Sequence, residues 1–258
     1  MTNFNHLGAQ LHQALTDKQP LAPLTEQFPE LTVADAYQIQ LAMLQPRLDA
    51  GQTVIGKKIG VTSQVVMDML GVDQPDFGHL LSGMLVSDGA ALSCTDFIAP
   101  KAEGEIAFVL KEDLIGPGVT LADVMRATAY VMPCFEIVDS RIKDWKIRIQ
   151  DTVADNASAA AFVLGDGVAD PREIDLACVG MTLEKNGEIV ATGAGAAALG
   201  HPANAVVWLA NTLGELGIAL KKGEVILSGS LAAMVAVQPG DQLRMSLGGI
   251  GSASIRFV

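Results

Sequence analysis

A glutamate inside an otherwise apolar segment is the feature that most constrains how this chain can fold. Glu136 lies within residues 131–138, which read VMPCFEIV and have the composition of a buried strand. An ionised carboxylate is costly to bury unless a cation or hydrogen-bond donors surround it. The fold must therefore bring positive charge to Glu136. That charge is either a metal ion or a basic side chain, Arg141 or Lys101, in a structural ion pair.

Two further carboxylates occur in PKAEGEIAFV, residues 100–109. In an extended chain, side chains two residues apart project from the same face, so Glu103 and Glu105 point into the same space. Like charges held this close raise each other's energy unless a cation lies between them. A solvated strand end with two exposed acids explains the bare pattern as well. Three carboxylates are a ligand set that Mg²⁺ or Mn²⁺ prefers.

Composition narrows the class of protein. The 258-residue length fits one large domain or two small ones, and the net charge of −12 leaves no basic patch for nucleic acid. We find no apolar run long enough to cross a membrane and no secretory signal, so we expect a cytoplasmic protein. The three cysteines lie outside any C-x-x-C spacing and are expected to be reduced. An anionic substrate would need local positive charge, which a metal ion supplies.

The first third of the chain has helical periodicity, over Asn5 to Lys18 and over Val33 to Leu48. Thr32 is the expected N-cap of the second helix, and Pro46 should kink it or end it early. We expect residues 1–50 to be mainly helical and to pack on a β-rich body. Shorter helices are predicted at Thr62 to Leu70, Thr120 to Thr128 and His201 to Leu216.

The remainder of the chain is predicted to be β-rich. Asn186-Gly187 favours a type I′ turn between two strands. Because strands and helices do not alternate regularly, a doubly wound sheet is a poor fit. We expect an α+β fold with a curled mixed β-sheet core and peripheral helices, in a single catalytic domain over residues 1–258. The predicted strands are Thr53 to Gly60, Ile106 to Leu110, Tyr130 to Val138, Ala160 to Leu164, Leu176 to Leu183, Ile189 to Thr192, Val225 to Leu227, Gln242 to Leu247 and Ala253 to Val258.

Other polar residues border these apolar strands. Strand alternation places Lys57 and Lys58 on opposite faces, so one of them points inward, where it finds an acid or becomes a base with a lowered pKa. A lysine reaching water from a strand edge is the alternative. Asp76 lies in a turn-type segment and could be only a turn-former. The segment 151–158 is either a capped loop or a pocket wall.

Six segments carry a resemblance to a known family. Taken together, they resemble the 2-oxopent-4-enoate (2-keto-4-pentenoate) hydratases of bacterial aromatic meta-cleavage pathways, in the fumarylacetoacetate hydrolase superfamily. The likeness runs from about residue 33 to residue 258, in the family's order. The segments are GKKIGVTS, GVDQPDFG, PKAEGEIAFVL, FEIVDSRIKDWKIRIQDTVADNAS, TGAGAAALGHPANAVVWLAN and GEVILSGSL.

The resemblance implies roles for particular residues. It implies that Glu103, Glu105 and Glu136 hold Mg²⁺ or Mn²⁺, and that Lys58, rather than Lys57, and Asp76 carry protons in the reaction. It also implies substrate contacts from the polar residues of two loops, which are Asn156, Ser158, Ser228 and Ser230.

The implied reaction is metal-dependent addition of water to 2-hydroxypenta-2,4-dienoate, giving 4-hydroxy-2-oxopentanoate. Two alternatives stay open, a 4-oxalocrotonate decarboxylase of the same superfamily and a non-catalytic partner subunit. The segment Asp144 to Thr152 resembles the hydratase branch more than the decarboxylases. The resemblance also implies a homo-oligomer and a complex with the other enzyme of the pathway.

Overall fold

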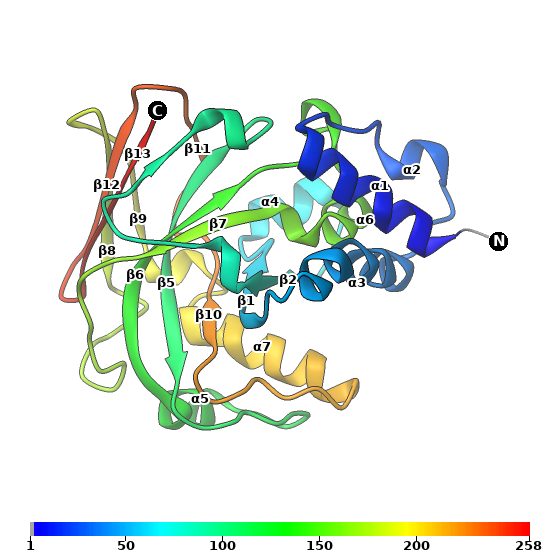
Figure 1. Cartoon of the computed structure of the whole chain (residues 1–258). Coiled ribbons are helices and arrows are strands. Elements are labelled where there is room, and N and C mark those ends of the chain that lie inside the picture. Colours follow the sequence, from blue (N-terminus) through cyan, green and yellow to red (C-terminus); the bar gives the residue numbers. More distant parts are fainter. Residues whose placement is uncertain (1–2) are drawn as a thin grey trace.

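Two β-sheets with helices around them make up residues 3–258, which a computed structural model describes (Figure 1). The larger sheet has eight strands in the order β2-β1-β10-β5-β6-β7-β3, with β11 paired to β5 off this path; the smaller sheet has five, in the order β4-β13-β12-β8-β9. This mixed, curled architecture confirms the predicted α+β class. The strands are β1 (Val54–Gly60), β2 (Asp76–Leu81), β3 (Leu85–Val86), β4 (Ala91–Leu92), β5 (Lys101–Leu110), β6 (Thr128–Val138), β7 (Ala159–Leu164), β8 (Gly180–Lys185), β9 (Glu188–Ala194), β10 (Val225–Leu227), β11 (Val235–Ala236), β12 (Gln242–Leu247) and β13 (Gly251–Phe257).

The helices gather mainly on the side of the larger sheet away from the smaller one (Figure 1). No helix within residues 3–258 is long and apolar enough to cross a membrane. Five short 3₁₀ turns, at residues 82–84, 94–96, 143–145, 156–158 and 195–197, complete the elements. The helices are α1 (Phe4–Asp17), α2 (Leu24–Gln27), α3 (Val33–Asp49), α4 (Gln64–Leu70), α5 (Leu121–Ala127), α6 (Ile149–Ala154) and α7 (Pro202–Glu215).

Helix α3 begins where the sequence predicts but ends later than expected. Thr32 caps it as predicted, in a capping box with Asp35. Of the two effects expected of Pro46, the early end does not occur, because the helix runs to Asp49. The Pro46 carbonyl still accepts a hydrogen bond from Ala50 N at 3.1 Å. The buried face of α3, which includes Ile39 and Met43, packs in a core shared with α1 and α6.

Several strand and helix boundaries differ from the predictions. Strand β5 begins at Lys101, so the Glu103–Glu105 pair lies inside a strand and not at its mouth. Asp76 begins strand β2 instead of forming a turn. Helix α4 is capped by Ser63, not by Thr62. For the two strands, pairing with a neighbouring strand set the boundary, and for α4 the choice between two adjacent capping residues set it. Local sequence patterns do not predict either with single-residue accuracy.

Two other segments have a secondary structure that differs from the prediction. The segment 151–158 begins within helix α6 instead of forming a loop throughout, and its alternative role as a pocket wall is confirmed, since Thr152, Ala157 and Ser158 line a cavity. The predicted strand over residues 176–183 forms only from Gly180 onward. The Asn186-Gly187 hairpin is confirmed, since both residues have the positive φ that a type I′ turn requires.

Gly104 determines which way its two acidic neighbours point. A Cβ atom on Gly104 would lie 2.5 Å from Met181 Sδ and 2.6 Å from Met245 Sδ, so the smaller sheet packs directly on β5 at this residue. Side chains alternate along a strand, so Glu103 and Glu105 project from the opposite face. The packing of the two sheets therefore directs both carboxylates away from the apolar core.

Strand β1 also depends on a missing side chain. A Cβ atom on Gly56 would lie 2.0 Å from Val225 O, because β10 runs beside β1 with parallel pairing. Gly180, at the start of β8, has no atom within 4 Å of its Cβ position. The two glycines form a matched pair, one crowded by backbone and one free.

We predict that Gly56→Ala lowers the free energy of unfolding by about 1–3 kcal/mol, because β1 and β10 must separate to admit the methyl group. Gly180→Ala should change it by less than about 0.5 kcal/mol. Urea unfolding of both variants measures the difference. Equal stabilities would show that the approach of β10 to β1 does not constrain residue 56.

Candidate metal centre and active site

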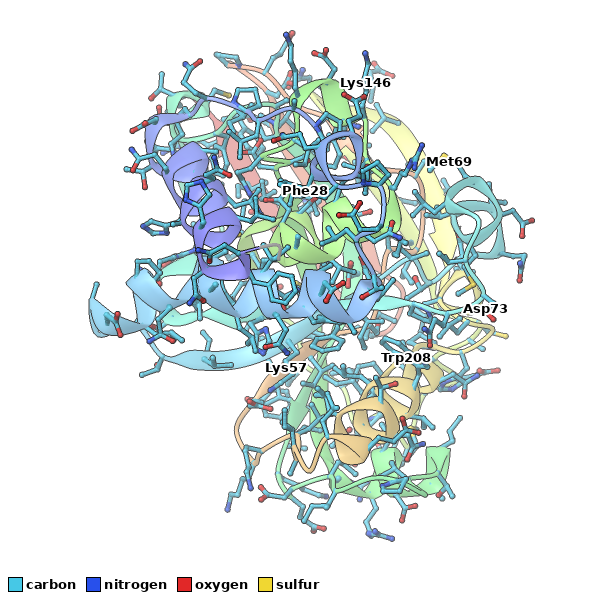
Figure 2. All side chains as sticks on the ribbon, turned by 90° about the vertical axis from the view of Figure 1, so that its right-hand side faces the viewer. Phe28, Lys57, Met69, Asp73, Lys146 and Trp208 are labelled. Carbon is cyan, nitrogen blue, oxygen red and sulfur yellow. The ribbon has the colours of Figure 1, made fainter. Side chains whose placement is uncertain are left out.

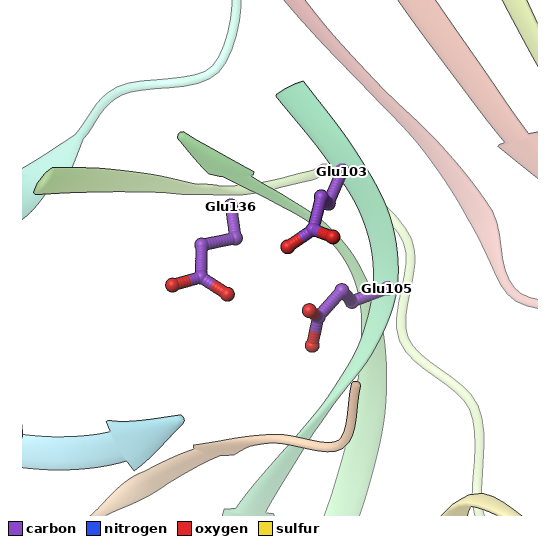
Figure 3. Close-up of side chains that lie close together, drawn as sticks. All are labelled: Glu103, Glu105 and Glu136. Atoms are coloured by element: carbon purple, nitrogen blue, oxygen red, sulfur yellow. The ribbon is translucent and has the colours of Figure 1, made fainter. Parts of the chain in front are cut away.

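Three carboxylates converge on one point between β5 and β6. These strands pair antiparallel with Glu103 opposite Glu136, and Glu105 lies two residues further along the same face of β5. One oxygen from each carboxylate can be chosen so that all three lie within 4.8 Å of one another (Figure 3). The strand register thus brings together the three acids that the sequence marked as a set.

Two of the three carboxylates are buried, and Glu103 is half-buried. Glu105 is 1% exposed and Glu136 is 0% exposed. Burial and then the carboxylate of Glu136 raise the pKa of Glu103 to about 7. Burial raises the pKa of Glu136 too, and the pKa of Glu105 is raised well above its usual range by burial, Glu136 and Glu103. The cluster holds more negative charge than the protein groups around it can balance.

The donor set fits a hard divalent cation. Neither oxygen of Glu136 accepts a hydrogen bond, although both are buried. Glu105 Oε2 accepts one from Gly229 N at 2.8 Å, a backbone donor that sequence reasoning missed. Buried carboxylate oxygens without partners are costly unless a cation binds them. Oxygen ligands alone favour an ion such as Mg²⁺ over softer metals.

Lys58 provides the nearest positive charge. Its Nζ lies 3.3 Å from Glu136 Oε1 and donates to Ala157 O at 3.0 Å. The alternative partners considered for Glu136 are excluded, since Arg141 pairs with Asp155 and Lys101 lies over the Trp145 ring. Burial lowers the pKa of Lys58, but the carboxylates around it outweigh burial and raise the pKa overall. Lys58 is therefore held in its charged form.

Lys57 is buried as well, on the opposite face of β1. Its Nζ pairs with Glu224 Oε1 at 2.8 Å. Strand alternation predicted the opposite faces, but not that both lysines would be buried. Only Lys58 faces the carboxylate cluster.

Asp76 lies beside Lys58 where β1 and β2 pair, opposite Gly60. A Cβ atom on Gly60 would lie 2.3 Å from Asp76 Oδ1 and 3.2 Å from Lys58 Nζ, so the absence of a side chain there lets acid and base approach. Asp76 Oδ1 is buried without a hydrogen-bond partner. Burial raises the pKa of Asp76, and Lys58 opposes that shift. Asp76 therefore keeps its proton to a higher pH than an exposed aspartate does.

A cavity of about 440 Å³ opens beside these groups. Lys58, Asp76, Glu103 and Glu105 make its polar end, together with Ser158, whose buried Oγ has no hydrogen-bond partner. Lys58 is the one basic side chain among the described residues that line it. The apolar wall, which sequence reasoning did not identify, comes from α4, from the end of β6 and from loops next to the larger sheet: Val65, Val66, Met69, Leu70, Val138, Ile147, Leu231 and Met234.

The four predicted substrate-binding residues divide into two pairs. Ser158 and Ser230 line the cavity, although Ser230 Oγ donates to Ala232 O at 2.6 Å. Asn156 and Ser228 do not line it. Asn156 Oδ1 accepts from His79 N at 2.8 Å and its Nδ2 donates to His79 O at 3.0 Å. Ser228 Oγ donates to Ile106 O at 2.8 Å. These two side chains hold the fold around the site instead of facing it.

The turn that carries Ser158 has an unusual backbone. Asn156, Ala157 and Ser158 have φ values of 54°, 49° and 57°, so three successive non-glycine residues are left-handed. Each such residue costs about 1 kcal/mol or more. A density of acids and hydroxyls marked this segment in the sequence, but nothing there indicated its conformation.

A second cavity of about 570 Å³ lies next to the first, and Asp76 contributes to both. It is bordered by α3, α6, α7 and the segment before β2, and Asp73 and Trp208 in Figure 2 mark its position. It is the larger space, but the three clustered glutamates do not line it. We therefore assign the chemistry to the smaller cavity.

Comparison with known proteins identifies the family of this chain. The family described as Fumarylacetoacetate (FAA) hydrolase C-terminal matches residues 66–258. The chain is 58% identical to a 2-hydroxyhexa-2,4-dienoate hydratase of Comamonas testosteroni, over 97% of this chain and 96% of that protein. It is 59% identical to a 2-hydroxypent-2,4-dienoate hydratase of Pseudomonas putida, over 84% of this chain and 99% of that protein.

A solved structure extends the likeness to the fold. The 4-oxalocrotonate decarboxylase from Pseudomonas putida G7, complexed with magnesium and adipate, superimposes with a TM-score of 0.96 at 40% identity, covering 99% of this chain and 97% of that one. The chain therefore belongs to the fumarylacetoacetate hydrolase superfamily, in the branch that contains these hydratases and decarboxylases.

Proposed function

We propose that this chain is a divalent-metal-dependent hydro-lyase that adds water to 2-hydroxypenta-2,4-dienoate, or to a close alkyl homologue, giving a 4-hydroxy-2-oxo acid. The observation that carries the proposal is the carboxylate cluster beside Lys58 and Asp76, at the polar end of a cavity whose other walls are apolar. A dienoate has this same polarity, with a charged 2-oxo acid end and an apolar tail. The 58–59% identity to two dienoate hydratases supports the same reading.

Glu103, Glu105 and Glu136 are the residues we propose to hold Mg²⁺ or Mn²⁺. The magnesium bound in the decarboxylase from Pseudomonas putida G7 supports a hard ion of this kind. When bound, such an ion supplies a compact positive charge that stabilises negative charge on the oxygens of a 2-oxo acid. It also balances the carboxylates that Lys58 alone leaves uncompensated.

Lys58 and Asp76 are the residues we propose to move protons. Ketonisation of the dienol requires a proton at the far end of the conjugated system, and hydration requires that a water molecule lose one. Lys58 enters the reaction protonated and is our candidate donor. Asp76, unpartnered at Oδ1, is suited to accept the proton of the attacking water. Ser158 Oγ is free to hydrogen-bond the substrate, and we propose that Ser230 contributes less because its hydroxyl is already engaged.

The cavity also favours a hydratase over a decarboxylase of 4-oxalocrotonate. That substrate carries a second carboxylate, and the described lining offers it no basic side chain beyond Lys58. A second anion against Val65, Met69 and Ile147 would be left uncompensated. The intact cluster in turn speaks against a non-catalytic partner subunit.

We propose that the whole chain works as one catalytic domain. Helix α3 of the N-terminal region supports this, because Gln40 Nε2 donates to Phe77 O at 3.1 Å and to Val153 O at 2.8 Å, next to Asp76 and the left-handed turn. A homo-oligomer, a complex with another enzyme of the pathway and a cytoplasmic location stay predictions.

Product analysis tests the proposed function. With Mg²⁺ or Mn²⁺, the protein should convert 2-hydroxypenta-2,4-dienoate to 4-hydroxy-2-oxopentanoate, and it should release little carbon dioxide from 4-oxalocrotonate. Glu105→Gln should abolish metal-dependent turnover while the circular dichroism spectrum stays unchanged. Glu188→Gln, on the exposed strand β9, is the matched control and should behave as wild type. Full activity in the presence of a chelator, or faster decarboxylation than hydration, would refute the proposal.

Metal binding should release protons. Because the pKa of Glu103 is raised to about 7, the metal-free cluster holds a proton below that pH, and a cation must displace it. We expect the affinity for Mn²⁺ to fall by about tenfold per pH unit below pH 7 for each proton displaced. Calorimetry in buffers of different ionisation enthalpy counts the protons. An affinity that stays constant from pH 6 to pH 8, with no proton release, would contradict the predicted ionisation.

Replacing Lys58 should affect catalysis more than binding. We expect Lys58→Met to lower kcat by at least about a hundredfold, because a positioned acid or base contributes that much. Lys57→Met removes the neighbouring buried lysine from the opposite face and should leave kcat within about threefold of wild type. Steady-state kinetics on both variants distinguishes the loss of the lysine that faces the carboxylates from the loss of the lysine on the other face of β1. A change confined to KM in Lys58→Met would indicate a binding role instead.

A further inference from the structure

The left-handed turn at residues 156–158 places two polar groups at the cavity and requires something to hold it. The Ala157 carbonyl accepts the hydrogen bond from Lys58 Nζ, and Ser158 Oγ faces the cavity without a partner. Three successive left-handed residues without a glycine are rarely populated by a free chain. The contacts that enforce this turn therefore control where both groups lie.

Arg141 is the centre of those contacts. It is 0% exposed and is among the largest fully buried side chains of the described residues. Its Nε and Nη2 donate to the carboxylate and the carbonyl of Asp155, the residue immediately before the turn. Its Nη1 donates to Asp139 O, and also to Ala159 O at 3.3 Å, the residue immediately after the turn. One planar side chain thus ties both ends of the turn to the end of β6.

The backbone around Arg141 completes this clamp. Arg141 N donates to Asp155 Oδ2 at 2.9 Å, and Asp139 N donates to Ser158 O at 2.8 Å. Ser158 N donates to Asp155 O at 3.0 Å. Asp139 and Arg141 lie three and five residues after Glu136, just beyond the end of β6, so the clamp continues from the strand that carries a candidate metal ligand. Arg141, Asp139 and Asp155 themselves do not line the cavity.

We propose that Arg141, acting through Asp155, is a positioning residue for the reaction. It holds the left-handed turn so that the Ala157 carbonyl orients the Lys58 ammonium group and the Ser158 hydroxyl reaches the substrate. The proposal rests on the proposed function for its effect on turnover, but not for its effect on the turn. A lysine would not substitute, because only the planar fork of a guanidinium reaches Asp155, Asp139 and Ala159 together.

The test compares Arg141→Met, Arg141→Lys and Asp155→Asn with Glu224→Gln. Glu224→Gln removes the charge from a different buried ion pair, with Lys57, and leaves the turn untouched, so it controls for a general loss of stability. Two properties are measured in each variant: hydrogen exchange of the amides of residues 155–159, and kcat with KM for 2-hydroxypenta-2,4-dienoate. Mn²⁺ affinity in the absence of substrate reports separately on the glutamate cluster.

We expect both Arg141 variants to exchange amide hydrogens at residues 155–159 at least about tenfold faster than wild type, with β5 and β6 unchanged. Their kcat should fall by about tenfold or more, because a small displacement of Lys58 and Ser158 is costly, while Mn²⁺ affinity stays within about twofold. The double variant Arg141→Met with Asp155→Asn should be no slower than Arg141→Met alone, since both remove the same contact. Glu224→Gln should change neither exchange in the turn nor kcat.

The outcomes separate the two proposals. Unchanged exchange at residues 155–159 in Arg141→Met, or unchanged kcat despite faster exchange, would overturn the role of Arg141. Equal losses of kcat in Glu224→Gln and Arg141→Met would also overturn it, because stability alone would then explain them. If wild-type protein hydrates no dienoate but the turn loosens in Arg141→Met, the clamp stands and the proposed function fails.

Discussion

Repulsion among three clustered carboxylates, two of them buried and one half-buried, is the constraint around which this structure is organised. Glu103, Glu105 and Glu136 lie close together in a region from which water is largely excluded, and Lys58 balances only part of their charge. Such an arrangement is unfavourable for folding and is kept where a site needs it. The pairing of β5 with β6 and the packing of the smaller sheet must supply the stability that the cluster lacks.

Packing on the opposite face of β5 fixes the direction in which the clustered glutamates point. Met181 and Met245 fill the space over Gly104, so β5 cannot turn its acidic face inward to the apolar core. Gly60 leaves room for Asp76 and Lys58 to meet. Glycines at these two positions let backbone and side chains approach where any Cβ atom would separate them. Two glycines, which carry no functional group, therefore determine the distances among the acidic and basic side chains of the site.

The polarity of the cavity explains how one fold can serve related reactions. Its polar end suits the charged end of an organic acid, and a decarboxylase of the same fold is complexed with magnesium and adipate, a dicarboxylic acid. Its apolar wall, largely from α4, distinguishes substrates by what lies beyond the first carbons. Chemistry and specificity thus come from different parts of the chain, the strands and the loops and helices respectively.

The sequence by itself determined the residues of the cluster, the α+β class and most of the strands, because burial of an acid in an apolar run and the alternation of side chains are local properties. Local pattern could also place Lys57 and Lys58 on opposite faces. Only the tertiary structure decided that Lys58 faces Glu136, that Arg141 joins Asp155, and that Asn156 and Ser228 turn away from the cavity. Those pairings depend on strand register and on a left-handed turn, which are set by contacts between residues far apart in the chain.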